Sequence, residues 1–122
     1  MIEKDEVEYE KFMIKDAQYV LMGFGIVSRV LKAAVEKLRE EGIKVGMLRP
    51  ISLFPFPKKI ITQIAAEVKK ILVVELNNGQ MLEDVKLAVC GKIPVEFYNR
   101  MGGVVPTTEE IVEQVKKKLF NE

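Results

Sequence analysis

The sequence contains no histidine, no tryptophan and only one cysteine, Cys90, among its 122 residues. Without histidine, the common zinc sites and any histidine-based acid–base or nucleophilic catalysis are excluded. A single cysteine cannot build a disulfide or a cysteine metal cluster within the chain, which favours a reducing cytoplasm. We expect Cys90, at a helix end before Gly91, to be an inert, half-buried thiol.

Long hydrophobic runs and a strong net charge are also missing. No apolar run reaches the roughly 18 residues of a membrane span, and residues 1–12 are too acidic for a signal peptide. The net charge is +1, so neither nucleic acid nor an anionic membrane is an expected partner. With 48% hydrophobic and 30% charged residues, the chain is expected to form one globular domain over residues 1–122. Abundant lysine and glutamate are compatible with a thermophilic origin.

Apolar runs alternate with helical stripes along the chain. Residues 6–14, within a lead-in of residues 1–16, predict an edge strand with a bulge, because the alternation of apolar residues slips between Tyr9 and Phe12. Residues 17–122 predict four strand–helix units, with strands at 18–24, 43–48, 71–76 and 93–98. Gly42 and Gly91 are expected to end two of the helices, and Thr107 with Glu110 forms a capping box for the last one. This order predicts a three-layer α/β/α fold whose central sheet has about five strands, mostly parallel, with an antiparallel edge strand.

The first clear helix, residues 27–38, follows a segment that resembles a dinucleotide fingerprint, Gly23-Phe24-Gly25-Ile26-Val27-Ser28. Its charged residues, including Arg29 and Lys32, fall away from the apolar stripe. Backbone N–H groups at such a turn can hold a phosphate. However, Ser28 stands at the third small position, and Arg49 occupies the place where an acidic residue would bind the ribose. A tight strand-to-helix turn is the alternative interpretation, and the sequence leaves both open.

Polar residues follow each of the later strands, at the carboxyl edge where open α/β sheets bind ligands. Two arginines among amides could hold a carboxylate or a phosphate, because guanidinium groups suit both. Asparagine also occurs at such corners simply because it tolerates turn geometry. The candidate anion or partner-contact corner consists of Arg49, Asn77, Asn78, Gln80, Asn99 and Arg100.

An apolar loop rich in proline follows the strand at 43–48. Exposed apolar side chains on a loop are typical of a partner interface, whereas the alternative is that they pack under the same domain. The candidate interface consists of Leu53, Phe54, Phe56 and Met101. Glu75 is expected to end a buried strand. Glu83 and Asp84 are adjacent on the following helix, so we expect them to be first-turn charges favoured by the helix dipole rather than a catalytic pair.

Three segments together resemble one family. Residues 48–57 (LRPISLFPFP), 74–81 (VELNNGQM) and 98–103 (YNRMGG) are similar, in the right order, to corners of the C-terminal domain of the alpha subunit of 2-oxoacid:ferredoxin oxidoreductases. The resemblance implies a fold like the C-terminal domain of transketolase. The family usually has Tyr-Gly-Ser where this chain has Phe24-Gly25-Ile26, so a hydroxyl contact at that corner is not expected here.

The resemblance also implies a function for the whole complex, the oxidative decarboxylation of a 2-oxoacid to an acyl-CoA. It implies thiamine diphosphate, Mg²⁺, coenzyme A and iron–sulfur clusters in that complex, none of them bound by this chain alone. The implied partners are the rest of the alpha subunit, a beta subunit, gamma and delta subunits where present, and ferredoxin as the acceptor. On this basis the chain is a non-catalytic structural and subunit-contact domain. A free-standing small-ligand or nucleotide-binding module, a scaffold and a homodimer remain alternatives.

Overall fold

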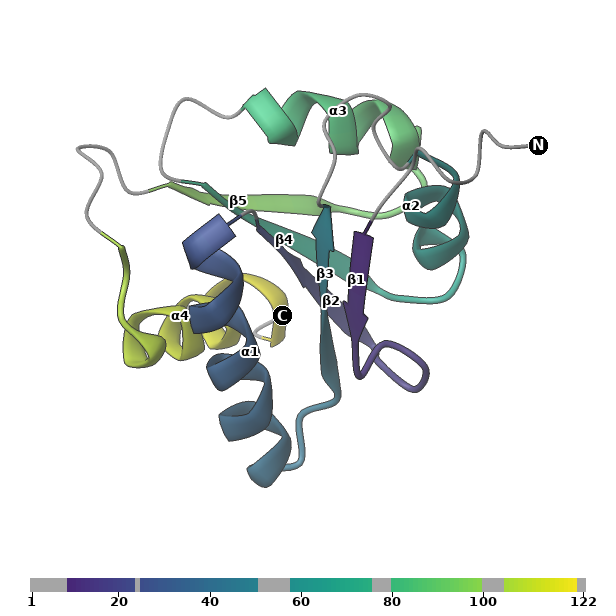
Figure 1. Ribbon diagram of the computed structural model, residues 1–122. Helices are drawn as coiled ribbons and strands as arrows, with labels where there is room; N and C mark the ends of the chain where they lie inside the picture. Colours follow the sequence, from purple (N-terminus) through teal and green to yellow (C-terminus); the bar gives the residue numbers. More distant parts are fainter. Residues whose placement is uncertain (1–8, 24, 51–57, 76–79, 100–104, 121–122) are drawn as a thin grey trace.

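The computed structural model describes residues 9–23, 25–50, 58–75, 80–99 and 105–120 (Figure 1). Strands and helices alternate along these ranges as the apolar pattern predicts. A short π-helical turn, Lys116–Phe120, extends the last helix. The elements are β1 (Tyr9–Phe12), β2 (Tyr19–Met22), α1 (Gly25–Glu40), β3 (Val45–Pro50), α2 (Lys58–Ala65), β4 (Lys70–Glu75), α3 (Gln80–Val89), β5 (Val95–Asn99) and α4 (Thr108–Val115).

The five strands form one sheet in the order β1-β3-β2-β4-β5. Strands β2, β3, β4 and β5 run parallel, and β1 pairs antiparallel with β3 at the edge. The predicted three-layer α/β/α fold with an antiparallel edge strand is therefore confirmed. Among the described helices, none is both long and apolar enough to cross a membrane.

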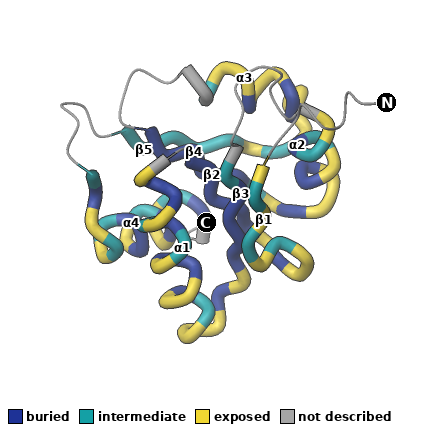
Figure 2. Tube along the Cα trace, viewed as in Figure 1, coloured by how far each residue is buried: buried dark blue, intermediate teal, exposed yellow. Residues whose placement is uncertain are grey.

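Two hydrophobic cores lie on opposite faces of the sheet, and the central strands between the helices are buried (Figure 2). Helices α1 and α4 cover one face, and α2 and α3 cover the other. Successive residues of β2 point to the two cores in turn: Tyr19 and Leu21 face α1 and α4, while Val20 and Met22 face α2 and α3. Burial on both faces explains why this strand is apolar at every position rather than at every second one.

The helix ends follow the local signals in the sequence. Gly42, just past α1, has a φ of 88°, a left-handed conformation that glycine adopts without a steric penalty. At the start of α4, the Glu110 N–H donates to Thr107 Oγ1 over 3.1 Å, and the Thr107 N–H donates to Glu110 Oε1 over 3.2 Å. The predicted capping box is confirmed, and it satisfies two N–H groups that the helix itself cannot pair.

The edge strand differs from its prediction. Over the described residues, β1 pairs with β3 without an inserted residue, from Tyr9 opposite Pro50 to Phe12 opposite Met47. A bulge within this strand is therefore wrong. The apparent slip in the pattern arises because Tyr9, with 36% exposure, lies on the open side, whereas Phe12 packs against the core under α1.

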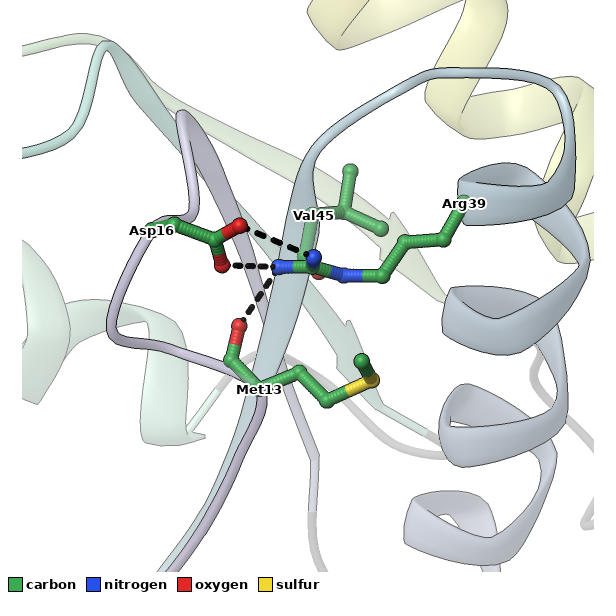
Figure 3. A network of polar contacts seen from close by, with 4 residues as sticks. All are labelled: Met13, Asp16, Arg39 and Val45. Atoms are coloured by element: carbon green, nitrogen blue, oxygen red, sulfur yellow. Dashed lines mark hydrogen bonds and ion pairs between the residues drawn. The ribbon is translucent and has the colours of Figure 1, made fainter.

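Arg39, near the end of α1, ties the turn between β1 and β2 to the sheet (Figure 3). Its Nε donates to the Val45 carbonyl over 2.8 Å, and its Nη2 donates to the Met13 carbonyl over 2.8 Å. Its Nη1 and Nη2 donate to the two carboxylate oxygens of Asp16, over 3.2 and 2.7 Å. This bidentate pair is the stronger kind of charge-assisted contact. The turn also packs closely on β3, since a Cβ atom on Gly46 would lie 2.7 Å from the Met13 carbonyl oxygen.

The first prediction concerns Asp16, whose pKa Arg39 lowers from the ordinary value of 3.8, chiefly through the hydrogen bonds. Because folding favours the ionised form, its stabilisation is complete above 3.8 and is lost as the pH falls through the lowered value. Asp16→Asn is therefore expected to lower the urea midpoint at pH 7, and this difference from the parent chain should disappear in acid. Glu113→Gln, which removes an exposed carboxylate on α4, is the control. A difference for Asp16→Asn that stays constant with pH contradicts the account.

Candidate functional site

The four parallel strands end at the same edge of the sheet, as their shared direction requires. From β2 the chain crosses through α1 to β3 on one side, and from β4 it crosses through α3 to β5 on the other. Open α/β sheets bind ligands where the crossing direction reverses, here between β2 and β4. Gly23 and Glu75 are the described residues at this point.

Gly23 is needed for the packing of α1 on the sheet. A Cβ atom at this position would lie 2.8 Å from the side chains of both Val27 and Leu31, two buried residues of α1. This contact explains the first glycine of the fingerprint-like segment without any ligand. It agrees with the interpretation of the segment as a tight strand-to-helix turn.

Glu75 is a buried carboxylate, 6% exposed, at the end of β4. Its Oε2 accepts a hydrogen bond of 2.9 Å from the N–H of Leu82, in the first turn of α3. A negative charge is favourable at a helix N-terminus, where N–H groups lack partners within the helix. Asn99 lies opposite Glu75 in the β4–β5 ladder, so this pair forms one side of the carboxyl edge. The geometry gives Glu75 the role of a helix cap supplied by the neighbouring strand.

Arg49, at the end of β3, belongs to a second cluster on the other side of this edge. Its Nε donates to Glu10 Oε1 over 2.9 Å, and Lys32 Nζ from α1 contacts Glu10 Oε2 at 2.6 Å. Lys32 Nζ also lies 5.6 Å from the centre of the Phe12 ring. The hydrogen bonds from Lys32 and then from Arg49 lower the pKa of Glu10 below its usual value. Glu10 is thus held as an anion between two cations from different elements.

A hollow of about 430 Å³ opens beside this cluster. Its volume falls within the common range of small-molecule pockets, about 300–1,000 Å³. Its walls come from α1, β1 and β3, so it lies on the face of the sheet that α1 covers. Among the described residues, its lining consists of Glu10, Ile26, Ser28, Arg29, Lys32 and Arg49.

The structure separates members of the predicted anion corner. Arg49 lies on β3 and Asn99 on β5, with β2 and β4 between them. At the usual spacing, three strand-to-strand steps amount to roughly 14 Å. Gln80 begins α3, beside Glu75 rather than beside Arg49. The remaining members lie outside the described residues, as does the whole candidate apolar interface: Asn77, Asn78, Arg100, Leu53, Phe54, Phe56 and Met101.

Glu10, Arg29 and Lys32 are the site residues that the sequence pattern did not single out. Lys32 lies away from the apolar stripe of α1, as predicted, but it reaches sideways to β1. A usable signal was present in the strand, because Glu10 shares a face with Phe12 in a period of two. A carboxylate on the covered face of an edge strand, opposite Arg49 in the ladder, indicates an ion pair.

Neither thiol nor metal chemistry has support in the described residues. Cys90 is exposed, whereas a half-buried thiol was predicted from the sequence. It has a φ of 55° just past the end of α3, and its Sγ donates to the Leu87 carbonyl over 3.1 Å. Within the described ranges, no group of three or more carboxylate or thiol side chains could hold a metal ion.

The comparisons with known proteins point to one family. The family model for pyruvate:ferredoxin oxidoreductase core domain II matches residues 17–111. The ketoisovalerate oxidoreductase subunit VorB of Methanothermobacter marburgensis is 46% identical over 116 residues, which are 95% of this chain and 33% of that protein. The 2-oxoglutarate synthase subunit KorA of the same organism is 32% identical over 109 residues, or 89% of this chain and 29% of that protein. The chain spans about a third of the length of these relatives.

Solved structures agree with the fold. A 2-oxoglutarate:ferredoxin oxidoreductase from Magnetococcus marinus, with 2-oxoglutarate, coenzyme A and succinyl-CoA bound, superposes with a TM-score of 0.78 at 29% identity. The match covers 90% of this chain and 19% of that one. A split-gene transketolase, an inactive beta4 tetramer, superposes with a TM-score of 0.72 at 18% identity, over 91% of this chain and 41% of that one. The second likeness shows the fold alone.

The second prediction tests Glu75 as a cap rather than an acid–base group. Glu75→Ala leaves the Leu82 N–H without this acceptor, and the free energy of unfolding is expected to fall by about 1–3 kcal/mol. Glu83→Ala, an exposed carboxylate in the same first turn of α3, is the matched control and should cost much less. Urea denaturation followed by circular dichroism measures both, and equal losses would contradict the cap.

Proposed function

This chain belongs to the pyruvate:ferredoxin oxidoreductase core domain II family, and from this premise we propose its role. It is the C-terminal structural and subunit-contact domain of the alpha subunit of a thiamine-diphosphate-dependent 2-oxoacid:ferredoxin oxidoreductase. The whole complex decarboxylates a 2-oxoacid oxidatively to an acyl-CoA. The observation that carries the proposal is the match of residues 17–111 to this family model. The aligned residues correspond to about a third of the length of the relatives.

The chemistry of this domain supports an assembly role. The described carboxylates at the carboxyl edge are already engaged, Glu75 with the start of α3 and Glu10 with Arg49 and Lys32. The chain has no histidine to act as a general base near neutral pH. Thiamine diphosphate, Mg²⁺, coenzyme A and the iron–sulfur clusters therefore belong to other parts of the complex in this proposal. The relatives are named for different 2-oxoacids, which fits a domain that does not select the substrate.

The partners in this proposal are the remaining alpha-subunit domains, the beta subunit and any gamma and delta subunits. Ferredoxin accepts electrons from the whole complex. They meet this domain at the carboxyl edge, where the corners after the parallel strands gather. The cytoplasm is the proposed location, because a chain with a single cysteine suits a reducing compartment. The apolar loop that carries Leu53, Phe54 and Phe56, together with Met101, is proposed as part of the contact.

The third prediction is recovery of activity on reassembly. The purified chain is mixed with the missing part of an alpha subunit and with a beta subunit, and 2-oxoacid-dependent reduction of ferredoxin or a dye is measured. Activity that appears only when all parts are present supports the proposal. Binding of the partners without activity would instead identify a scaffold, and tight nucleotide binding by the chain alone would identify a free-standing ligand module.

The fourth prediction concerns Phe54 in the proposed contact. Phe54→Asp places a charge in an apolar interface, and hot-spot residues of such interfaces are worth at least about 2 kcal/mol, so the affinity for the partner should fall by roughly 30-fold. Leu87→Asp introduces the same charge at a position on α3 that is 67% exposed and is not part of the proposed contact. Sedimentation velocity measures association, and thermal melting tests folding.

Unfolding of the isolated Phe54→Asp chain would show that Phe54 belongs to the core, and the contact would then be wrong. Equal weakening by Phe54→Asp and Leu87→Asp would also contradict a contact centred on this loop.

A further inference from the structure

The residues that line the hollow carry more positive charge than the carboxylate of Glu10 can balance. Three cations line it, Arg29 and Lys32 from α1 and Arg49 from β3, against the single carboxylate of Glu10. The described walls therefore hold a net charge of +2 from these groups, whereas the whole chain has only +1. Such a concentration of one sign in a concave site attracts an anion of small size.

Two of these cations, Lys32 and Arg49, contact the same carboxylate, that of Glu10. Each of its two carboxylate oxygens takes a different cation, with Arg49 Nε at 2.9 Å from Oε1 and Lys32 Nζ at 2.6 Å from Oε2. The cations come from separate elements, so the fold rather than chance side-chain placement brings them together. An incoming anion would meet the same two cations, and both of them lower the pKa of Glu10, which is the direction expected where negative charge is favoured.

Arg29 supplies a further positive group at the same hollow. It lies one turn before Lys32 on α1, a spacing that places both side chains on the same side of the helix. Within the described part of the chain, no carboxylate pairs with Arg29. The first half of α1 also lines the hollow, and the positive end of a helix dipole adds to the attraction. Arg29 therefore retains a guanidinium group that can bind an added anion.

The volume of the hollow and the apolar side chain of Ile26 favour a ligand larger than a bare ion. Ile26, which is 57% exposed, stands at the rim among these charges. The volume of about 430 Å³ exceeds what one carboxylate fills. A doubly charged phosphoryl group balances the residual charge of +2, while the organic part of the ligand can pack on Ile26. A single carboxylate leaves half of that charge unbalanced.

We propose that this hollow, lined by Arg29, Lys32, Arg49 and Glu10, binds the phosphoryl group of a small organic ligand. Arg29 is the principal ligand to the phosphoryl oxygens, and Lys32 and Arg49 are shared between the phosphoryl group and Glu10. Glu10 keeps the two cations in place when no ligand is bound and weakens binding by competing for them. This site goes beyond the proposed assembly role and does not depend on it.

The fifth prediction uses the 122-residue chain with pyrophosphate as the probe, titrated by calorimetry at low salt. Arg29→Ala should weaken binding by about tenfold, because hydrogen bonds to charged groups are the strong ones. Glu10→Gln removes the competing charge and should tighten binding by about threefold, a small gain in the range of an exposed charge pair. Lys37→Ala, on the same helix but paired with Glu109, is the matched control and should leave binding unchanged.

A second readout locates the probe. In ¹H–¹⁵N spectra, the shifts caused by pyrophosphate should concentrate in residues 26–32 and 47–49, and acetate at the same concentration should cause much smaller ones. Thermal melting confirms that each variant is folded. If Glu10→Gln unfolds because β1 loses its contacts with Lys32 and Arg49, the affinities of Arg29→Ala and Lys37→Ala for pyrophosphate still test the site.

Three results would overturn the site. The first is that pyrophosphate gives no binding heat with the parent chain. The second is that Arg29→Ala and Lys37→Ala weaken binding equally, which would indicate diffuse surface charge. Equal responses to acetate and pyrophosphate would show that the hollow does not select a phosphoryl group. None of these results bears on reassembly with the alpha and beta subunits, so this site and the proposed function are tested separately.

Discussion

Strands β2 and β4 must bury both of their faces, and the arrangement of the other elements follows from this requirement. Each strand sends alternate side chains into two cores, one under α1 and α4 and the other under α2 and α3. Parallel neighbours with helical crossovers satisfy the strand N–H and C=O groups while covering both faces. Because β2, β3, β4 and β5 run parallel, their carboxyl ends lie at one edge of the sheet, and the crossing direction reverses between β2 and β4.

The two edges of the sheet are therefore different. At the amino edge, Arg39 binds the turn before β2 to the start of β3 with four hydrogen bonds, so this edge is closed by the chain's own groups. At the carboxyl edge, Glu75 caps α3, and Glu10 lies between Lys32 and Arg49 beside a hollow. The surfaces proposed for partners and for a phosphoryl group lie at the carboxyl edge.

Much of the fold could be predicted because its signals are local. The apolar runs, the glycines past the helix ends and the Thr107–Glu110 capping box each depend on residues close in sequence, and each is confirmed. The bulge in β1 was predicted wrongly because a strand of four residues gives too few positions to fix its phase. Glu10 and Phe12 occupy the face toward α1, whereas the aromatic Tyr9 belongs to the other face and is 36% exposed.

The candidate site was less predictable because it depends on contacts between distant residues. Arg49 was identified from the sequence, but its partner Glu10 lies 39 positions earlier, and Lys32 comes from a helix between them. Only the strand order shows that Arg49 and Asn99 belong to different sides of the edge. A linear sequence places all corners of a parallel sheet at one edge, but it does not say which of them are neighbours.

The central claim is that the carboxyl edge of this sheet is the surface that meets the rest of a larger assembly. Amide hydrogen exchange of the chain, alone and mixed with the remaining alpha-subunit domain and a beta subunit, tests it most directly. The account predicts slower exchange on mixing at the strand ends and helix starts of this edge, in residues 26–29, 47–50, 80–83 and 97–99. Slowing confined to the opposite edge, around residues 13–18 and 41–45, or no slowing anywhere, would contradict it.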